Sequence, residues 1–93
     1  MIMQSVMQKQ KRCYLTNSTV GLEKHHVMNG TGLRDKAEKY GLWVWLTADM
    51  HRWIHNTPDG RKYAYTLKAE AQRVFEQTHT RAEWMANFHK NYI

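Results

Sequence analysis

The segment that most constrains the fold is Leu42–His55, in which an aromatic and β-branched run passes directly into a helical pattern. The residues Leu-Trp-Val-Trp-Leu at 42–46 favour a strand, because such side chains pack well on a pleated sheet. Thr47 follows at once and can cap a helix with its hydroxyl, and Asp49 suits the positive end of the helix dipole. We therefore predict a strand joined without a loop to a helix that runs from Ala48 to about His55.

The other elements are predicted from turn signals and helical spacing. Asn29-Gly30 is a strong turn signal after an apolar run, and Gly41 is suited to end a short helix. Thr80 and Glu83 match a capping box that begins a last helix. The expected elements are a strand at 22–28, a helix at 35–40, a turn at 56–60, a long helix at about 65–78 and a final short helix. The predicted fold class is α+β.

The length of 93 residues is that of one small domain with a thin margin of stability. We expect a flexible arm at residues 1–10 and a single domain at 11–93. Cys13 stands alone, which excludes an internal disulfide and favours a reducing compartment. No apolar run approaches the ~20 residues that span a bilayer, and the N-terminus lacks a signal-peptide pattern, so we predict a cytoplasmic protein without a membrane partner.

Positive charge is in excess, with 14 lysines and arginines against 8 acidic residues and a formal net charge of +6. Such an excess favours an anionic partner, most commonly nucleic acid. Candidate phosphate contacts are Arg34, Lys36 and Lys39 between the two strands and Arg52 on the following helix. A solvated helix face explains the first three equally well.

Four of the 6 histidines form two close pairs. His51 and His55 are one turn apart on the predicted helix, so both imidazoles can bind one metal ion. His25 and His26 are adjacent at the end of the predicted strand and should point to opposite faces. One of them can therefore join the same ion, while the other is left for a different task such as accepting a proton.

This set of groups suits hydrolysis of a phosphodiester. A metal ion stabilises charge that develops on the phosphate, and an imidazole, with an ordinary pKa near 6.5, is well matched as a base at neutral pH. The positive surface would supply affinity for the backbone. Surface histidines without any metal are the simpler explanation of each pair taken alone.

The chain resembles the HNH (ββα-metal) nuclease family, in which a strand ending in His-His and a second strand lead into a helix with a His-x-x-x-His pattern. The resemblance rests on His25-His26-Val27 and on the segment Leu46–His55. Small phage HNH-like proteins also tend to end in Lys-Asn-Tyr followed by Ile or Leu, and this chain ends Lys90-Asn91-Tyr92-Ile93. The similarity covers roughly residues 11–93.

The resemblance implies a ββα-metal (His-Me finger) core with two additional C-terminal helices. It gives His25, His51 and His55 the metal-ligand positions and His26 the position of the general base. It also implies a phage-encoded protein that acts on DNA with one divalent ion. That ion is Mg²⁺ in the first place, with Zn²⁺, Ni²⁺ or Mn²⁺ as alternatives because imidazole suits softer ions.

The chain departs from the family pattern in ways that leave a second function open. Relatives carry two Cys-x-x-Cys motifs, of which only Cys13 remains here, so no structural Cys₄ zinc is expected. The middle Asn of the pattern is also missing from residues 41–43. We expect a DNA endonuclease. The alternative is a nuclease-like scaffold of little or no activity that binds DNA or a host defence protein such as a CRISPR nuclease.

Overall fold

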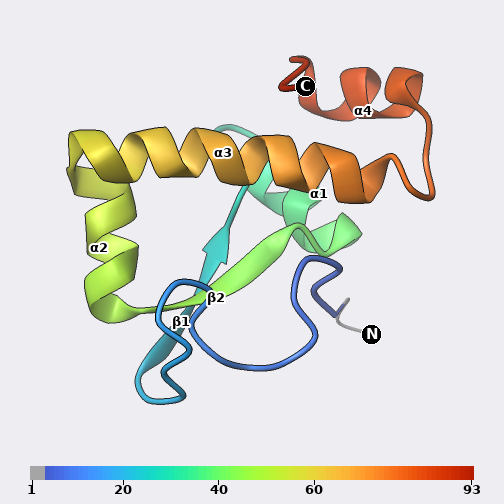
Figure 1. Cartoon of the computed structure of the whole chain (residues 1–93). Helices are drawn as coiled ribbons and strands as arrows, with labels where there is room; N and C mark the ends of the chain where they lie inside the picture. Colours follow the sequence, from blue (N-terminus) through green and yellow to red (C-terminus); the bar gives the residue numbers. More distant parts are fainter. Residues whose placement is uncertain (1–3) are drawn as a thin grey trace.

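The computed structural model describes residues 4–93 and has two antiparallel strands and four helices, an α+β fold. Residues 1–3, the start of the expected arm, lie outside the described residues. The elements in chain order are β1 (Leu22–His26), α1 (Leu33–Tyr40), β2 (Trp43–Thr47), α2 (Ala48–Asn56), α3 (Pro58–Phe75) and α4 (Arg81–Phe88). In Figure 1, α2 and α3 meet at a corner, α3 runs across the strands, and α4 lies near its far end.

The pairing of β1 with β2 determines which side chains share a face. His25 lies opposite Val44, and His26 lies opposite Trp43. Because side chains alternate along a strand, His25 and Val44 are on one face and His26 and Trp43 are on the other. Helix α2 contacts both strands as well as α3, so the face with His25 is turned toward these helices.

The described part of the N-terminal arm runs along β2. The Ser5 hydroxyl donates to the Trp43 carbonyl at 2.6 Å, and the Val6 amide donates to the Gly41 carbonyl at 2.9 Å. The Gln8 side-chain oxygen accepts from the Trp45 amide at 2.9 Å. Ser5, Val6 and Gln8 are therefore hydrogen-bonded to residues 41–45, although a flexible arm was expected over this segment.

Local capping signals explain where most helices begin and end. Thr47 accepts from the Met50 amide at 3.3 Å, and Thr80 and Glu83 form the predicted capping box. Gly41 ends α1 with a positive φ of 71°, as its position predicted. These three boundaries depend on neighbouring residues alone, which is why the sequence predicted them correctly.

The predicted start of the long helix was wrong. The turn expected at 56–60 is in fact the first turn of α3, which begins at Pro58. Thr57 is the C-cap of α2 and also the N-cap of α3, where its hydroxyl accepts from the Gly60 amide at 2.9 Å. Proline suits the first position of a helix because its φ is already helical and no amide is lost. Pro58 therefore starts a helix here, where the density of turn residues suggested a loop.

A compact apolar core is formed by side chains of β2, of the adjoining loops and of all four helices. Its fully buried members include Val27, Leu42, Val44, Leu46, Leu67 and Trp84. Cys13 is also completely buried, and its amide donates to the Ser18 carbonyl at 2.7 Å. Among the described residues, no helix has the length and apolar character needed to cross a membrane.

Candidate metal centre

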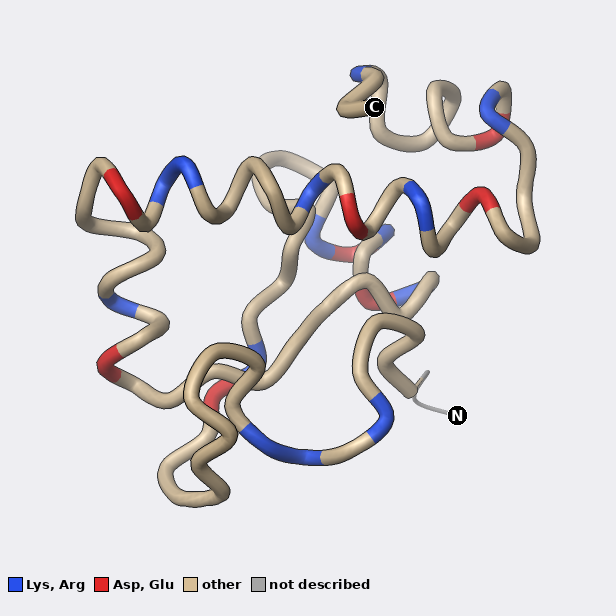
Figure 2. Tube along the Cα trace, viewed as in Figure 1, with Lys and Arg blue, Asp and Glu red and all other residues tan. Residues whose placement is uncertain are grey.

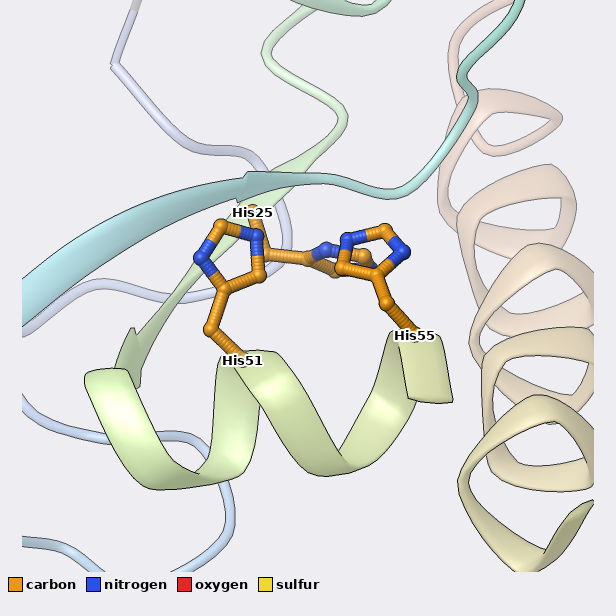
Figure 3. A group of neighbouring side chains, drawn as sticks. All are labelled: His25, His51 and His55. Atoms are coloured by element: carbon orange, nitrogen blue, oxygen red, sulfur yellow. The ribbon is translucent and has the colours of Figure 1, made fainter. Parts of the chain in front are cut away.

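Three histidines from two elements converge on one point. β1 supplies His25, and α2 supplies His51 and His55 from successive turns. The ring centroids lie 5.4 Å (His25–His51), 5.2 Å (His25–His55) and 5.0 Å (His51–His55) apart. One nitrogen from each ring lies within 4.8 Å of the others, and Figure 3 shows the three rings turned toward each other between the strand and the helix.

His25 is the buried member of the cluster, with 2% of its surface exposed. Burial is the main reason that its pKa is lowered to about 3, and the neighbouring His55 and His51 imidazoles add to the effect. Its Nδ1 atom is buried and has no hydrogen-bond partner within residues 4–93. An unpaired polar atom is costly in a core, because buried polar atoms almost always have a hydrogen-bond partner.

Glu23 holds the His51 ring in place. Its Oε1 atom lies 2.8 Å from His51 Nδ1, which leaves Nε2 of that ring available to a metal. A carboxylate on the outer nitrogen of a metal-binding histidine orients the ring and makes it a stronger ligand. Glu23 was not identified from the sequence. The signal was present, because a residue two positions before His25 on a strand lies on the same face.

The donor set fits a divalent metal ion. Imidazole nitrogens suit Zn²⁺, Ni²⁺ and similar ions better than Mg²⁺, which prefers oxygen ligands. Structural zinc sites in proteins have four protein ligands, whereas this cluster offers three. The three-histidine cluster could therefore hold one metal ion and leave at least one coordination position for another molecule.

A cavity of about 240 Å³ opens beside the cluster and is lined by His25 and His55 together with positively charged side chains. Its other lining residues are Asn29, Ile54, Arg61, Ala64 and Lys68. Lys68 is half-buried, and burial lowers its pKa. Burial lowers the pKa of His55 as well, with further contributions from His51 and then the positive charges of Arg34 and Lys68.

Arg61 and Lys68 were not identified from the sequence. They are seven residues apart on α3, a spacing that places both on one helix face. Arg61 was expected just after a turn and before the long helix, so this shared face could not be predicted. Correct placement of the helix start would have revealed it.

His26 is not brought together with the other three histidines. Its side chain lies on the opposite face of β1, where Nε2 is 2.7 Å from Oε2 of Glu38. The other oxygen of Glu38 accepts from Lys24 at 2.8 Å, and these bonds lower the pKa of Glu38, the bond from Lys24 contributing most. The assignment of His26 as a general base stays a prediction, and its partner in the structure is Glu38.

The four predicted phosphate contacts are spread over different surroundings. Arg34 is close enough to His55 to lower the pKa of that imidazole. Lys36 donates to the Asn87 carbonyl at 3.0 Å, and Lys39 lies 5.3 Å from the centre of the Tyr40 ring. Arg52 pairs with Asp49 on the exposed surface of α2. Figure 2 shows positive residues distributed over the arm, α1, α2 and α3, so no single element carries the excess charge.

Comparisons with known proteins give one informative relationship. The chain is 35% identical over 75 residues to a protein of Haemophilus influenzae named an uncharacterized glycosyltransferase. The match covers 81% of this chain, which spans only 28% of the length of that protein. No family model and no solved structure matches the chain.

These comparisons contradict the assignment to the HNH family that was made from the histidine pattern. No model of that family matches, and the relative that does match carries a different name. The resemblance rested on a few histidines and a short C-terminal tail, which different proteins can share. We therefore withdraw the family assignment, while the geometry of the three-histidine cluster stands independently of it.

Proposed function

We propose that this protein hydrolyses phosphodiester bonds of nucleic acid, with DNA as the expected substrate, and that it requires one divalent metal ion. The observation that carries the proposal is the cluster of His25, His51 and His55, which opens to a cavity lined by Arg61 and Lys68. An incomplete ligand set beside positive side chains is suited to bind an anionic substrate at a metal ion. The strand–strand–helix arrangement would place this centre at the surface of the α+β fold.

The protein groups around the centre have separate tasks in this proposal. His25, His51 and His55 would hold the ion, and Glu23 keeps the His51 ring oriented through its 2.8 Å contact. A bound divalent ion would supply stabilisation of the negative charge that grows on a phosphate oxygen during attack by water. Burial keeps His25 neutral, so protons compete weakly for this ligand at neutral pH.

His26 is our candidate for the general base. Its imidazole would accept a proton from the attacking water, and the Glu38 carboxylate, 2.7 Å away, would stabilise the resulting positive charge. Its position on the opposite face of β1 from His25 makes this the more demanding part of the proposal. The substrate would have to reach both faces at the end of the strand.

Two other functions have observations in their favour. A binding protein without catalysis is favoured by the separation of His26 from the cluster. Glycosyl transfer is suggested by the name of the relative, although this chain spans 28% of that protein. The cavity beside the histidines, of about 240 Å³, is smaller than the ~300–1,000 Å³ of sites that enclose whole small ligands, so a polymer lying across the surface fits this centre better than an enclosed sugar nucleotide.

The first experiment measures nicking of supercoiled plasmid by the purified chain with Mg²⁺, Mn²⁺, Ni²⁺ or Zn²⁺, together with the metal content of the protein. We expect metal-dependent nicking and about one ion per chain. His55→Ala should abolish both, whereas His89→Asn, at an exposed histidine on the far end of the chain, should retain both. Absence of nicking with every metal would contradict the hydrolase proposal.

A separate variant tests the base. His26→Ala should reduce nicking by about 10²–10⁴-fold, the usual contribution of general acid–base catalysis, without changing the bound metal. Equal nicking by the variant and the unmodified chain would show that His26 only pairs with Glu38. Loss of the bound metal would instead show that the variant has damaged the cluster.

A further inference from the structure

The cavity beside the three histidines has an unusual charge distribution. Arg61 and Lys68 line it, and the positive charge of Arg34 also reaches His55. None of the side chains that line the cavity is a carboxylate. A cavity with cations and no anion has a positive potential that would attract a negatively charged group.

The two cations on α3 have no ion-pair partner among residues 4–93. Glu70, the acidic residue closest in sequence to Lys68, accepts from the Tyr14 hydroxyl at 2.8 Å. Asp59, two residues before Arg61, is exposed and forms no ion pair among residues 4–93. Lys68 is partly removed from water in this unpaired state. A partly buried ammonium without a counter-ion is unfavourable, so an anion bound in the cavity would stabilise it.

We propose that Arg61 and Lys68, with Asn29 at the edge of the cavity, form a phosphate-binding subsite for the backbone of a polynucleotide. The guanidinium of Arg61 can give two parallel hydrogen bonds to phosphate oxygens, and the ammonium of Lys68 acts as a point charge. The subsite would hold a backbone phosphate beside the three-histidine cluster. This inference rests on the proposed function for its substrate class, but it can be tested without any hydrolysis.

The variants Arg61→Met and Lys68→Met remove one charge each from the cavity. Lys62→Met and Arg73→Met are matched controls, since both are exposed cations of the same helix that do not line the cavity. Lys68→Arg keeps the charge and serves as a rescue variant. Thermal unfolding of each variant shows whether it has folded.

Binding of a fluorescent oligothymidylate of ten nucleotides to the chelator-treated full chain is measured by anisotropy at several salt concentrations. Each cavity variant should weaken binding about tenfold. It should also lower by about one the number of counter-ions released on binding, as measured from the slope of log affinity against log salt concentration. The control variants should change affinity less than about twofold, because their charges lie outside the cavity and act on a bound phosphate only through screening solvent. Lys68→Arg should recover most of the affinity.

A parallel titration with inorganic phosphate, followed by amide NMR, separates the two sources of a phosphate group. Shifts at residues 29, 61 and 68, together with much tighter binding of the oligothymidylate, support the subsite. Equal losses in cavity and control variants would overturn the proposal, as would binding of free phosphate without any gain from the polymer. Selective loss of binding in a chain that never nicks DNA would retain this subsite and remove only the hydrolase proposal.

Discussion

Among single residues, His25 is under the strongest constraint. Its side chain is buried in the core, its Nδ1 atom lacks a hydrogen-bond partner within the described residues, and its pKa is lowered to about 3. Burial therefore favours the neutral form of this imidazole. A neutral imidazole is also the form that binds metal ions.

We predict that the metal-free chain loses stability in mild acid. The unfolded chain takes up a proton on His25 below the ordinary pKa of 6.5, while the folded chain resists it until about pH 3, so unfolding becomes easier as the pH falls through this window. The loss attributable to His25 between pH 6.5 and 4.5 should be roughly 2 kcal/mol. Urea unfolding at a series of pH values measures it. His25→Gln should show a shallower dependence, and an identical dependence in both chains would refute the assignment.

Glu23 should affect the metal without touching it. Glu23→Gln removes the negative charge 2.8 Å from His51 Nδ1, and we expect metal affinity to fall about tenfold or more. Titration calorimetry with Zn²⁺ measures this change. Asp35→Asn, which alters an exposed carboxylate on α1, is the control and should leave the affinity unchanged.

The sequence predicted the ligands of the cluster better than their surroundings. His51 and His55 follow from the periodicity of a helix, which depends on local spacing. Strand periodicity left the choice between His25 and His26 open, and His25 was chosen only through the family resemblance. Arg61 and Lys68 come from a third element, and their approach to the cluster depends on packing that no local pattern encodes. The contact between His26 and Glu38 joins residues from β1 and α1, so it could not be predicted from the sequence either.

Among the elements, the corner between α2 and α3 brings backbones into close contact. The two helices share Thr57 as a cap, with no loop between them. A Cβ atom added at Gly60 would lie 1.9 Å from the Trp53 carbonyl oxygen and 2.7 Å from the Ile54 Cα. The glycine is required by close approach of the helices, whereas local turn preferences suggested a loop at this position.

Gly60→Ala should therefore destabilise the protein. The new methyl group collides with backbone atoms of α2 that cannot rotate away, so we expect a loss of about 3 kcal/mol or more in the free energy of unfolding. Chemical denaturation provides the measurement. Thr66→Ala, at an exposed position of α3, should change stability by less than about 0.5 kcal/mol. Comparable stability of the two variants would show that the corner can relax.

The apolar face of α3 illustrates what helical periodicity predicts well. Helical spacing predicts one apolar face made of Leu67, Ala71, Val74, Phe75 and Thr78. Leu67, Ala71 and Phe75 are buried in the core, whereas Val74 is only partly buried and Thr78 is exposed. This part of the prediction held although the helix starts seven residues earlier than expected, because periodicity identifies a face even where the ends are uncertain. Capping and tertiary packing then set the boundaries.

For the whole molecule, a bound metal would act as a cross-link between β1 and α2. A chain of 93 residues has a small core, and a ligand that binds only the folded state adds directly to its stability. With free metal at about one hundred times the dissociation constant, the gain should be about 2.7 kcal/mol. The midpoint of thermal unfolding should then rise by roughly 10–20 °C.

Differential scanning calorimetry with Zn²⁺ and with a chelator tests this expectation. His55→Ala removes one ligand and should abolish most of the rise. A rise of equal size in the variant would place the metal elsewhere on the chain.

The α+β class followed from the sequence, because the strand run at 42–46 and the helical patterns around it are strong local signals. The family did not. A pair of histidine motifs and a short tail identify chemical groups in a useful arrangement, whereas family membership depends on similarity along the chain, and no family model matches. The proposed function therefore depends on the geometry of the centre.

Because Cys13 is completely buried, the rate at which its thiol is labelled can report local opening of the chain. A thiol reagent cannot reach this sulfur until the segment around residues 13–18 separates from the core, so the rate of labelling measures how often that separation occurs. No engineered label is needed, because no other cysteine competes. Labelling that slows when metal is added would show that opening at the N-terminal segment and binding at the histidines are energetically linked.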